Sequence, residues 1–328
     1  MQNIKWGIVG LGNIANKFAE DLALVSDAIL WAVASSNAER AQEFARKHKA
    51  IRHYDSYSSL FEDSAVQVVY IATLHPDHVP IAIEAIRHGK GVLCEKPLGI
   101  NTKEVQELIN LAQNHSLFLM EALWTRFNPA FEQTLQFIQE GALGLLRYIN
   151  ASFSFNGLDR SIDSRLFNPQ KAGGALLDIG IYPLFLAYQI LGIPKDIKAS
   201  AILTPQGVDV QLGFILTYET AQAVLYASFS HDEDMRATIC GEKGQIYLSS
   251  RWHETDQIHR VQSGKSTIIN CPVKGRGYYY EILEVHKCLI LGQTESKKWN
   301  WKNSLDLSSL MDQIRKQCGI VYPSDPDQ

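Results

Sequence analysis

The chain has 328 residues, of which 46% are hydrophobic and 20% charged, and its formal net charge is −4. This length predicts two domains around ordinary globular cores, and the acidic balance without any Lys/Arg block argues against a nucleic-acid or anionic-membrane partner. Five scattered cysteines without a C-x-x-C pair favour a reducing compartment over a disulfide framework or a cysteine zinc site. With no leader and no apolar run approaching membrane-spanning length, we expect a cytoplasmic protein that binds small molecules.

A glycine turn follows the first predicted strand, residues 4–9, and precedes a helix-like stretch over residues 16–22. It reads Gly10-Leu11-Gly12-Asn13-Ile14-Ala15. In a dinucleotide site the first glycine makes the tight turn, the second lets the backbone approach the pyrophosphate, and a small third residue allows close helix packing. The helix start adds free N–H groups and partial positive charge. The turn predicts a dinucleotide site contacted by Gly10, Gly12, Asn13 and Ile14, although the motif alone also fits a turn without a ligand.

Short strand-like runs then alternate with helical periods. Because the runs at 68–72 and 91–94 are apolar throughout, they are typical of strands covered by helices on both faces. The alternation predicts a doubly wound parallel sheet in a first domain over residues 1–122, with ligands outside the strand ends at Gly10, Ser35, Thr73 and Glu95. The predicted strands are 29–34, 66–72, 91–94 and 117–120, and the predicted helices are 38–48, 80–88 and 103–114.

The end of the second strand bears on the choice of cofactor. NAD sites usually have an acidic residue there to bind the ribose, but this chain has Ser35-Ser36-Asn37, with Arg40 one helical turn later. Hydroxyl donors and a guanidinium suit a 2′-phosphate, so NADP is favoured and NAD is the alternative. Ser36 and Asn37 can instead cap the next helix while Arg40 is solvated, and both interpretations can hold together.

The ends of the third and fourth strands carry Thr73-Leu74-His75-Pro76-Asp77-His78 and Glu95-Lys96-Pro97. Two histidines without an i,i+4 helical setting or nearby cysteines make weak metal ligands, so we expect no metal. Cofactor or substrate contact by His75 or His78 is one interpretation, and packing is the other.

These motifs together resemble the glucose-fructose oxidoreductase and inositol dehydrogenase family. Met120-Glu121-Ala122-Leu123-Trp124-Thr125-Arg126-Phe127 and the run from Gly173 to Tyr182 are similar to its dimeric dihydrodiol dehydrogenase branch, which includes NADP-dependent xylose dehydrogenases. The resemblance extends through the run from Gly277 to Ile282 and the terminal helix near Tyr322. It implies an NADP-dependent oxidoreductase whose cofactor contacts also include Thr73, Leu74, His75, His78, Glu95, Lys96, Trp124 and Arg126.

After Phe127 the pattern changes to one helix, ending near Glu140, and then mostly alternating strand-like runs. Alternation predicts a largely antiparallel sheet with one face open, in a second α/β domain over residues 123–328. The resemblance implies a homodimer through that face, and a solvated face is the alternative. The expected strands are 148–155, 210–216, 223–229, 237–240 and 245–248. Two helices follow, 278–291 and 304–318, and the resemblance implies that the last packs back near the first domain.

The expected chemistry moves a hydride to or from a carbinol carbon while a protein group handles the hydroxyl proton. The resemblance assigns Lys96 to the catalytic centre, and Asp178 and Tyr182 lie four residues apart on a predicted helix. Most of the family has a histidine in place of Tyr182. A phenol with a pKa near 10 needs help, and a charge about 4 Å away is worth roughly 4 kcal/mol, or about three pKa units. Lys96 and Tyr182 are therefore the expected proton-handling pair.

The substrate is less determined. Trp124, Arg126, Phe127, Phe155 and Trp252 are candidates for an aromatic pocket around a xylose-like sugar or a trans-dihydrodiol, to which Asp178 and Tyr182 would also contribute; structural packing is the alternative for each aromatic residue. A hydrolase of the same fold that retains NAD, or a non-catalytic cofactor-binding regulator, are rival functions. The presence of Lys96, Asp178 and Tyr182 argues against the regulator.

Overall fold

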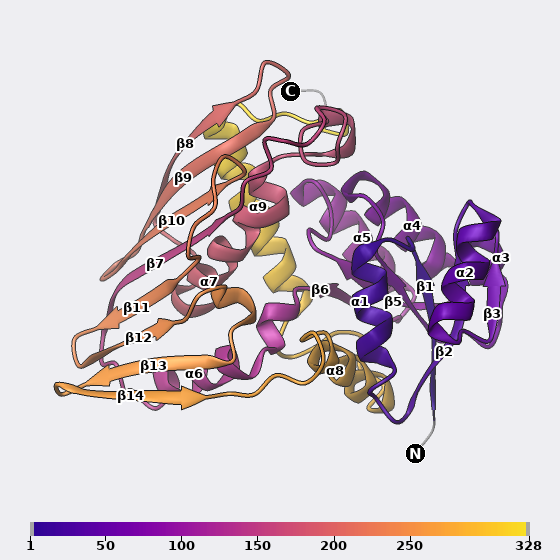
Figure 1. Ribbon diagram of the computed structural model, residues 1–328, viewed down its shortest axis with the longest axis horizontal. Helices are drawn as coiled ribbons and strands as arrows, with labels where there is room; N and C mark the ends of the chain where they lie inside the picture. Colours follow the sequence, from indigo (N-terminus) through magenta and orange to yellow (C-terminus); the bar gives the residue numbers. More distant parts are fainter. Residues whose placement is uncertain (1–2, 326–328) are drawn as a thin grey trace. The chain divides into compact units, whose positions relative to one another are not determined.

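A computed structural model of the chain describes residues 3–325. The chain forms two compact units, which Figure 1 colours by sequence: the first contains Met1–Trp124 and Lys274–Leu305, and the second contains Thr125–Val273 and Asp306–Gln328. The segment Lys274–Leu305 therefore lies in the first unit, whereas the sequence analysis places it in the second domain.

The first unit is built on a six-stranded sheet in the order β3-β2-β1-β4-β5-β6. All its pairings are parallel, which confirms the predicted doubly wound sheet. Every residue of β4 and β5 is buried, as strands covered on both faces require. The strands are β1 (Ile4–Val9), β2 (Ala28–Ala34), β3 (Arg52–Tyr54), β4 (Val68–Ile71), β5 (Gly91–Glu95) and β6 (Leu119–Ala122).

Three helices of this unit begin at a residue whose side chain caps the helix. The side chain of Asn37 accepts the amide hydrogen of Arg40, and the side chain of Asn101 accepts that of Glu104. One helix begins earlier than expected, at His75, because Pro76 fits a first helical turn and Pro80 is accommodated inside the helix. The sequence analysis predicts neither the short β3 nor the short α3. The helices are α1 (Asn13–Leu22), α2 (Ala38–His48), α3 (Tyr57–Glu62), α4 (His75–Arg87) and α5 (Thr102–Asn114).

The buried carboxylate of Asp21 ties the later segment to this unit. It accepts hydrogen bonds from the backbone N–H of Arg276, at 2.7 and 2.9 Å, and of Tyr279, at 3.0 Å, at the start of α8 (Tyr279–Ile290). Gly275 has φ +65°, and a Cβ there would lie 2.1 Å from Asp21 Oδ1. Asp21 thus caps a helix more than 250 residues away in sequence, a link that no local pattern reveals.

Replacing Asp21 with alanine should lower the free energy of unfolding by about 1–3 kcal/mol, because the amides at the start of α8 lose their acceptors. Urea unfolding measures the loss. Glu20→Ala is the matched control: Glu20 meets the same Arg276 through an exposed side-chain ion pair of 3.3 Å, which should be worth less than about 1 kcal/mol. Equal losses in the two variants would contradict the capping role.

The second unit is built on an eight-stranded sheet in the order β14-β13-β12-β11-β7-β10-β9-β8. Its neighbours are antiparallel except for β7 and β10, which run parallel, so the predicted mostly antiparallel sheet is confirmed. β8, β13 and β14 were not predicted. The strands are β7 (Leu146–Ser154), β8 (Asp196–Leu203), β9 (Asp209–Thr217), β10 (Gln222–Ser228), β11 (Ala237–Gly241), β12 (Gly244–Leu248), β13 (Gln257–Gln262) and β14 (Lys265–Asn270).

One face of this sheet is covered by helices. Within the second unit, α6 (Pro129–Gln139) contacts β13 and α7 (Ile181–Leu191) contacts β7 and β10, and Figure 1 shows both helices on the same side. The terminal α9 (Trp301–Cys318) begins in the first unit, where Trp301 and Leu305 pack against the core. Cross-strand partners on the opposite face form one row: Ile215, Val224, Asn150, Thr238, Tyr247, His259 and Ile268.

The stretch Pro169–Leu191 is long and apolar enough to span a membrane by length and composition, with a mean hydropathy of 1.5. The expectation that no apolar run approaches this length is therefore wrong. In this structure 83% of the apolar window is buried inside the protein, as in the core helix of a globular unit.

Candidate functional site

The glycine turn after β1 leaves room for a ligand at the start of α1. Gly10 has φ +80°, and a Cβ there would lie 2.5 Å from the backbone carbon of Ala72, so only glycine fits. A Cβ on Gly12 would have nothing within 4 Å. Gly12 is the N-cap of α1 and, within residues 3–325, makes no side-chain cap hydrogen bond, and the amides of a first helical turn have no partner inside the helix. The arrangement fits a phosphate of a dinucleotide.

The neighbouring strand ends offer further contacts for a cofactor. Within the described residues, Thr73 Oγ1 is buried without a hydrogen-bond partner. The apolar side chains of Ile14, in the first turn of α1, and Leu74, the N-cap of α4, are exposed, while His75 and Lys96 are half-buried. An unpaired hydroxyl beside exposed apolar groups is what a ligand with polar groups and flat rings would cover.

His78 has a structural role. Its Nδ1 lies 2.8 Å from the carbonyl oxygen of Pro97 and its Nε2 lies 3.3 Å from that of Thr73, so the ring connects the ends of β4 and β5. Burial lowers the pKa of His78 to about 4, so the imidazole is neutral at physiological pH. The packing interpretation fits His78, whereas His75 contacts its ring at 5.7 Å from a more open position.

Glu95 turns its carboxyl group into the protein interior. Tyr70 donates a hydrogen bond to it, and burial raises the pKa of Glu95 to about 7. Its neighbour Lys96 follows at the carboxyl end of β5. Because the carboxyl group of Glu95 accepts the Tyr70 hydroxyl, the predicted contact between Glu95 and the cofactor would use the Glu95 backbone.

The end of β2, where the sequence predicts contact with the ribose, agrees with both interpretations of residues 35–40. Ser35 is buried, and its Oγ accepts the Asn37 amide at 3.2 Å, while Asn37 Oδ1 accepts the Arg40 amide at 2.9 Å. Asn37 thus provides the helix cap. The side chains of Ser36 and Arg40 are exposed. Neither is the acidic residue that NAD sites usually have here, which would repel a 2′-phosphate.

In the second unit, Asp178 and Tyr182 lie on consecutive helical turns, as predicted, but the first turn, Leu176–Gly180, is a π-helix. Arg165 Nη1 lies 2.9 Å from Asp178 Oδ1. The ring of Tyr182 is 5.3 Å from that of Phe153 and 5.5 Å from that of His253. Sequence analysis missed Arg165, Phe153 and His253, because they come from three distant segments and belong to no motif.

The residues expected to form an aromatic pocket differ in their exposure and contacts. Trp252 is 2% exposed and donates its indole N–H to the Ser152 carbonyl at 2.9 Å, which favours packing. Trp124 is buried and stacks on Tyr278 at 5.1 Å within the first unit. Phe155 is half-buried beside Phe229 at 5.1 Å.

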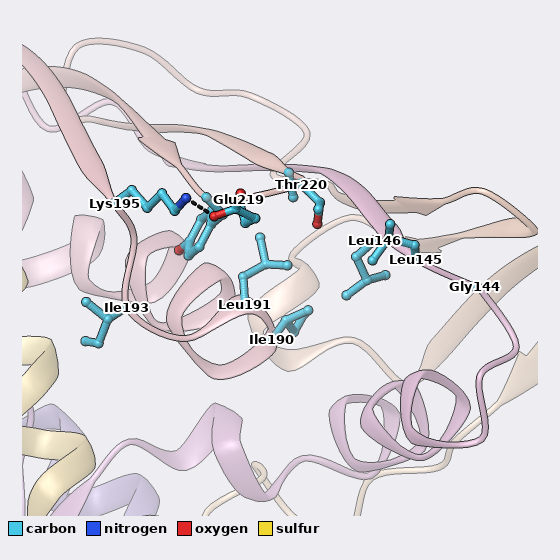
Figure 2. A pocket seen from close by; sticks show the side chains of 11 residues that line it. Gly144, Leu145, Leu146, Ile190, Leu191, Ile193, Lys195, Glu219 and Thr220 are labelled. Carbon is cyan, nitrogen blue, oxygen red and sulfur yellow. Dashed lines mark ion pairs between the residues drawn. The ribbon is translucent and has the colours of Figure 1, made fainter.

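Arg126 lies in the second unit beside a surface pocket. Buried Arg126 forms an ion pair of 2.7 Å with Glu132, and both line a pocket of about 390 Å³. A larger pocket, about 470 Å³, contains none of the predicted site residues. Figure 2 shows apolar side chains around it, including Leu191 and Ile193, and the ion pair between Lys195 and Glu219. Across residues 3–325, no group of three or more His, Cys, Asp or Glu side chains could hold a metal ion.

Comparison with known proteins connects these features. Residues 4–123 match the model of an oxidoreductase family with an NAD-binding Rossmann fold, and residues 131–247 match the GFO/IDH/MocA C-terminal domain. The chain belongs to the GFO/IDH/MocA oxidoreductase family. Members of this family are oxidoreductases. The Rossmann domain binds a nicotinamide dinucleotide, in agreement with the open space at Gly12.

Relatives match the chain over nearly its full length. The trans-1,2-dihydrobenzene-1,2-diol dehydrogenase of Mus musculus is 36% identical, covering 98% of this chain and 99% of the relative. The scyllo-inositol 2-dehydrogenase (NADP(+)) IolU of Bacillus subtilis is 33% identical, with the same coverage of 98% and 99%. An aldose-aldose oxidoreductase from Caulobacter crescentus, 21% identical, shares the fold with a TM-score of 0.88 over 97% of this chain and 98% of that chain.

Gly12→Ala should weaken binding of the dinucleotide at least tenfold, about 1.4 kcal/mol, because its methyl group would occupy the space that the pyrophosphate approaches. The free energy of unfolding should change by less than about 1 kcal/mol, because the protein leaves that space open. Calorimetric titration and urea unfolding measure the two effects. Gly10→Ala is the contrast and should destabilise the fold itself. Unchanged cofactor affinity in Gly12→Ala would contradict the assigned position.

Proposed function

We propose that this protein is an NADP-dependent oxidoreductase that transfers a hydride between the nicotinamide and a hydroxyl-bearing carbon of a sugar or cyclic trans-diol. The full-length similarity to a dihydrobenzene-diol dehydrogenase and to an NADP(+) inositol dehydrogenase carries the proposal. Both relatives are named for ring compounds that bear hydroxyl groups. The exposed Ser36 and Arg40 at the ribose end support the preference for NADP.

The proposed reaction assigns a role to Lys96, Asp178 and Tyr182. The bound nicotinamide supplies or accepts the hydride. Tyr182 exchanges the proton of the substrate hydroxyl, and the ammonium group of Lys96 stabilises its phenolate. Asp178, held by Arg165, accepts a hydrogen bond from a substrate hydroxyl and orients the ring. Trp124 and Phe155 offer aromatic surface to the substrate.

A turnover assay tests this function. Purified protein with NADP⁺ is incubated with aldopentoses, aldohexoses, their methyl glycosides, inositols and trans-dihydrodiols, and both the absorbance of the reduced cofactor and the release of free sugar are followed. We expect sustained reduction, many equivalents per enzyme, with at least one of these compounds. Cleavage of a glycosidic bond with no net accumulation of reduced cofactor would instead identify a hydrolase.

Arg40→Ala tests the cofactor preference. We expect the wild-type protein to bind NADP at least tenfold more tightly than NAD, about 1.4 kcal/mol, because the guanidinium can pair with the 2′-phosphate. The substitution should reduce this ratio while NAD affinity stays nearly constant, as measured by calorimetry. Arg46→Ala, later on the same helix, is the control. Equal affinities of the wild-type protein for both cofactors would reject the preference.

Tyr182→Phe and Lys96→Met test the proton-handling pair. Each should lower kcat by about 10²–10⁴, the usual contribution of a general acid or base, and leave cofactor affinity nearly unchanged. If the two residues act as one unit, the double substitution should cost little more than the worse single one. A near-normal kcat in Tyr182→Phe would show that Lys96 or a water molecule, and not Tyr182, exchanges the proton. Fully additive losses in the double variant would show that Tyr182 and Lys96 have separate roles.

We further propose that the protein works in the cytoplasm as a homodimer that joins the open faces of two eight-stranded sheets. That face carries exposed apolar side chains on several strands, including Tyr148, Ile202, Ile215 and Ile268. Such a patch on a flat sheet suits an isologous contact between identical subunits. Light scattering at micromolar concentration should give twice the chain mass, and Ile215→Lys should give the monomer mass. A wild-type monomer would exclude the assembly.

A further inference from the structure

The helix that carries Asp178 and Tyr182 begins without a side-chain cap of its own. Ala175 is its N-cap residue, and within the described part of the chain it has no side-chain cap hydrogen bond. The first amides of a helix have no partner inside the helix and need an acceptor when they are buried. Leu176 and its neighbours are buried, so the acceptor has to come from elsewhere in the fold.

Asp209, the first residue of β9, is that acceptor. It is 0% exposed, and its Oδ2 accepts the Leu176 amide hydrogen at 2.6 Å. The Ala175 amide faces the same carboxyl group. The other oxygen, Oδ1, is buried and has no hydrogen-bond partner among residues 3–325. A carboxyl group from one strand therefore holds the first turn of a helix that lies more than 30 residues earlier in sequence.

The glycine run before this helix is shaped around the same carboxyl group. Gly174 has φ +133°, and a Cβ there would lie 2.1 Å from Asp209 Oδ1 and 2.9 Å from the Tyr322 hydroxyl. Tyr322 donates a hydrogen bond to the Gly173 carbonyl at 2.9 Å. Glycine, aspartate and tyrosine thus fix the chain immediately before Asp178, and only glycine at position 174 lets the carboxyl group approach.

We propose that Asp209 is a positioning residue of this enzyme: it anchors the first helical turn and thereby sets where Asp178 and Tyr182 point. This inference rests on the proposed roles of those two residues in the reaction. Because Asp209 is fully buried, we assign it no contact with substrate or cofactor. Its effect passes through the backbone of residues 174–176 to Asp178 on the same turn and to Tyr182 on the next turn.

The surroundings of Asp209 make the anchor sensitive to pH. Burial raises the pKa of Asp209 to about 7, although the amides of Leu176 and Ala175 and the charge of Arg315 favour the ionised form. Cys318 and Tyr322 also face the carboxyl group, and burial raises their pKa values, so both stay neutral. Below about pH 7 the carboxyl group binds a proton and its hydrogen bonds to the amides lose their charge assistance.

Asp209→Asn tests the proposal, with Asp196→Asn on the exposed start of β8 as the matched control. Hydrogen exchange followed by mass spectrometry needs no substrate, so it tests the anchoring role of Asp209 even if no sugar or diol is turned over. We expect amides of residues 175–182 to exchange about tenfold faster in Asp209→Asn and unchanged in the control. Unchanged exchange there, or equally faster exchange throughout the second unit, would overturn the anchoring role.

Turnover provides the second readout. The ratio of wild-type kcat to Asp209→Asn kcat should rise from near 1 at pH 6 to about tenfold or more at pH 8, while NADP affinity stays the same. A ratio that does not change with pH would contradict the ionised anchor. If Asp209→Asn does not fold, Tyr322→Phe removes only the hydroxyl bond to Gly173, and it should raise exchange at residues 173–178; no increase would likewise overturn the proposal.

Discussion

The amide groups at the starts of helices constrain this structure more than any other feature. A helix leaves its first N–H groups without internal partners, and each such group needs an acceptor when it is shielded from water. Two helix starts here meet that need with an aspartate from another element, Asp21 at α8 and Asp209 before α7. At α1 the N-cap is Gly12, which makes no side-chain cap hydrogen bond and has open space where a Cβ would lie. Glycines beside each helix start allow the acceptor to approach.

This constraint links stability to function. The two aspartates are internal acceptors and fix chain segments that are distant in sequence, whereas we propose that the donors at the start of α1 bind a phosphate of the cofactor. In this proposal the same physical need produces a structural cap in two places and a binding site in the third. Which of these occurs depends on whether a side chain from another element reaches the amides.

Burying carboxyl groups has a cost that depends on pH. Burial raises the pKa values of Glu95 and Asp209 to about 7, and that of Glu281 well above its usual range. A carboxyl group with a raised pKa binds protons more tightly in the folded state, so it stabilises the fold least at high pH. For Glu95 this loss occurs between its unfolded pKa of 4.5 and about 7. Buried His78, with its pKa lowered to about 4, acts in the opposite direction below pH 6.5.

The sequence by itself determined the parallel sheet of the first unit, the turn at Gly10 and Gly12, and the helical placement of Asp178 and Tyr182, because each depends on neighbours within a few residues. Only the tertiary structure decided that Lys274–Leu305 joins the first unit, that the Trp252 side chain is buried, and that His78 connects two strand ends. The tertiary structure also revealed the ion pair of Arg165 with Asp178 and the hydrogen bond from the Leu176 amide to Asp209. These outcomes depend on which distant groups meet, and a local pattern carries no information about the partner that a buried carboxyl group or indole finds across the fold.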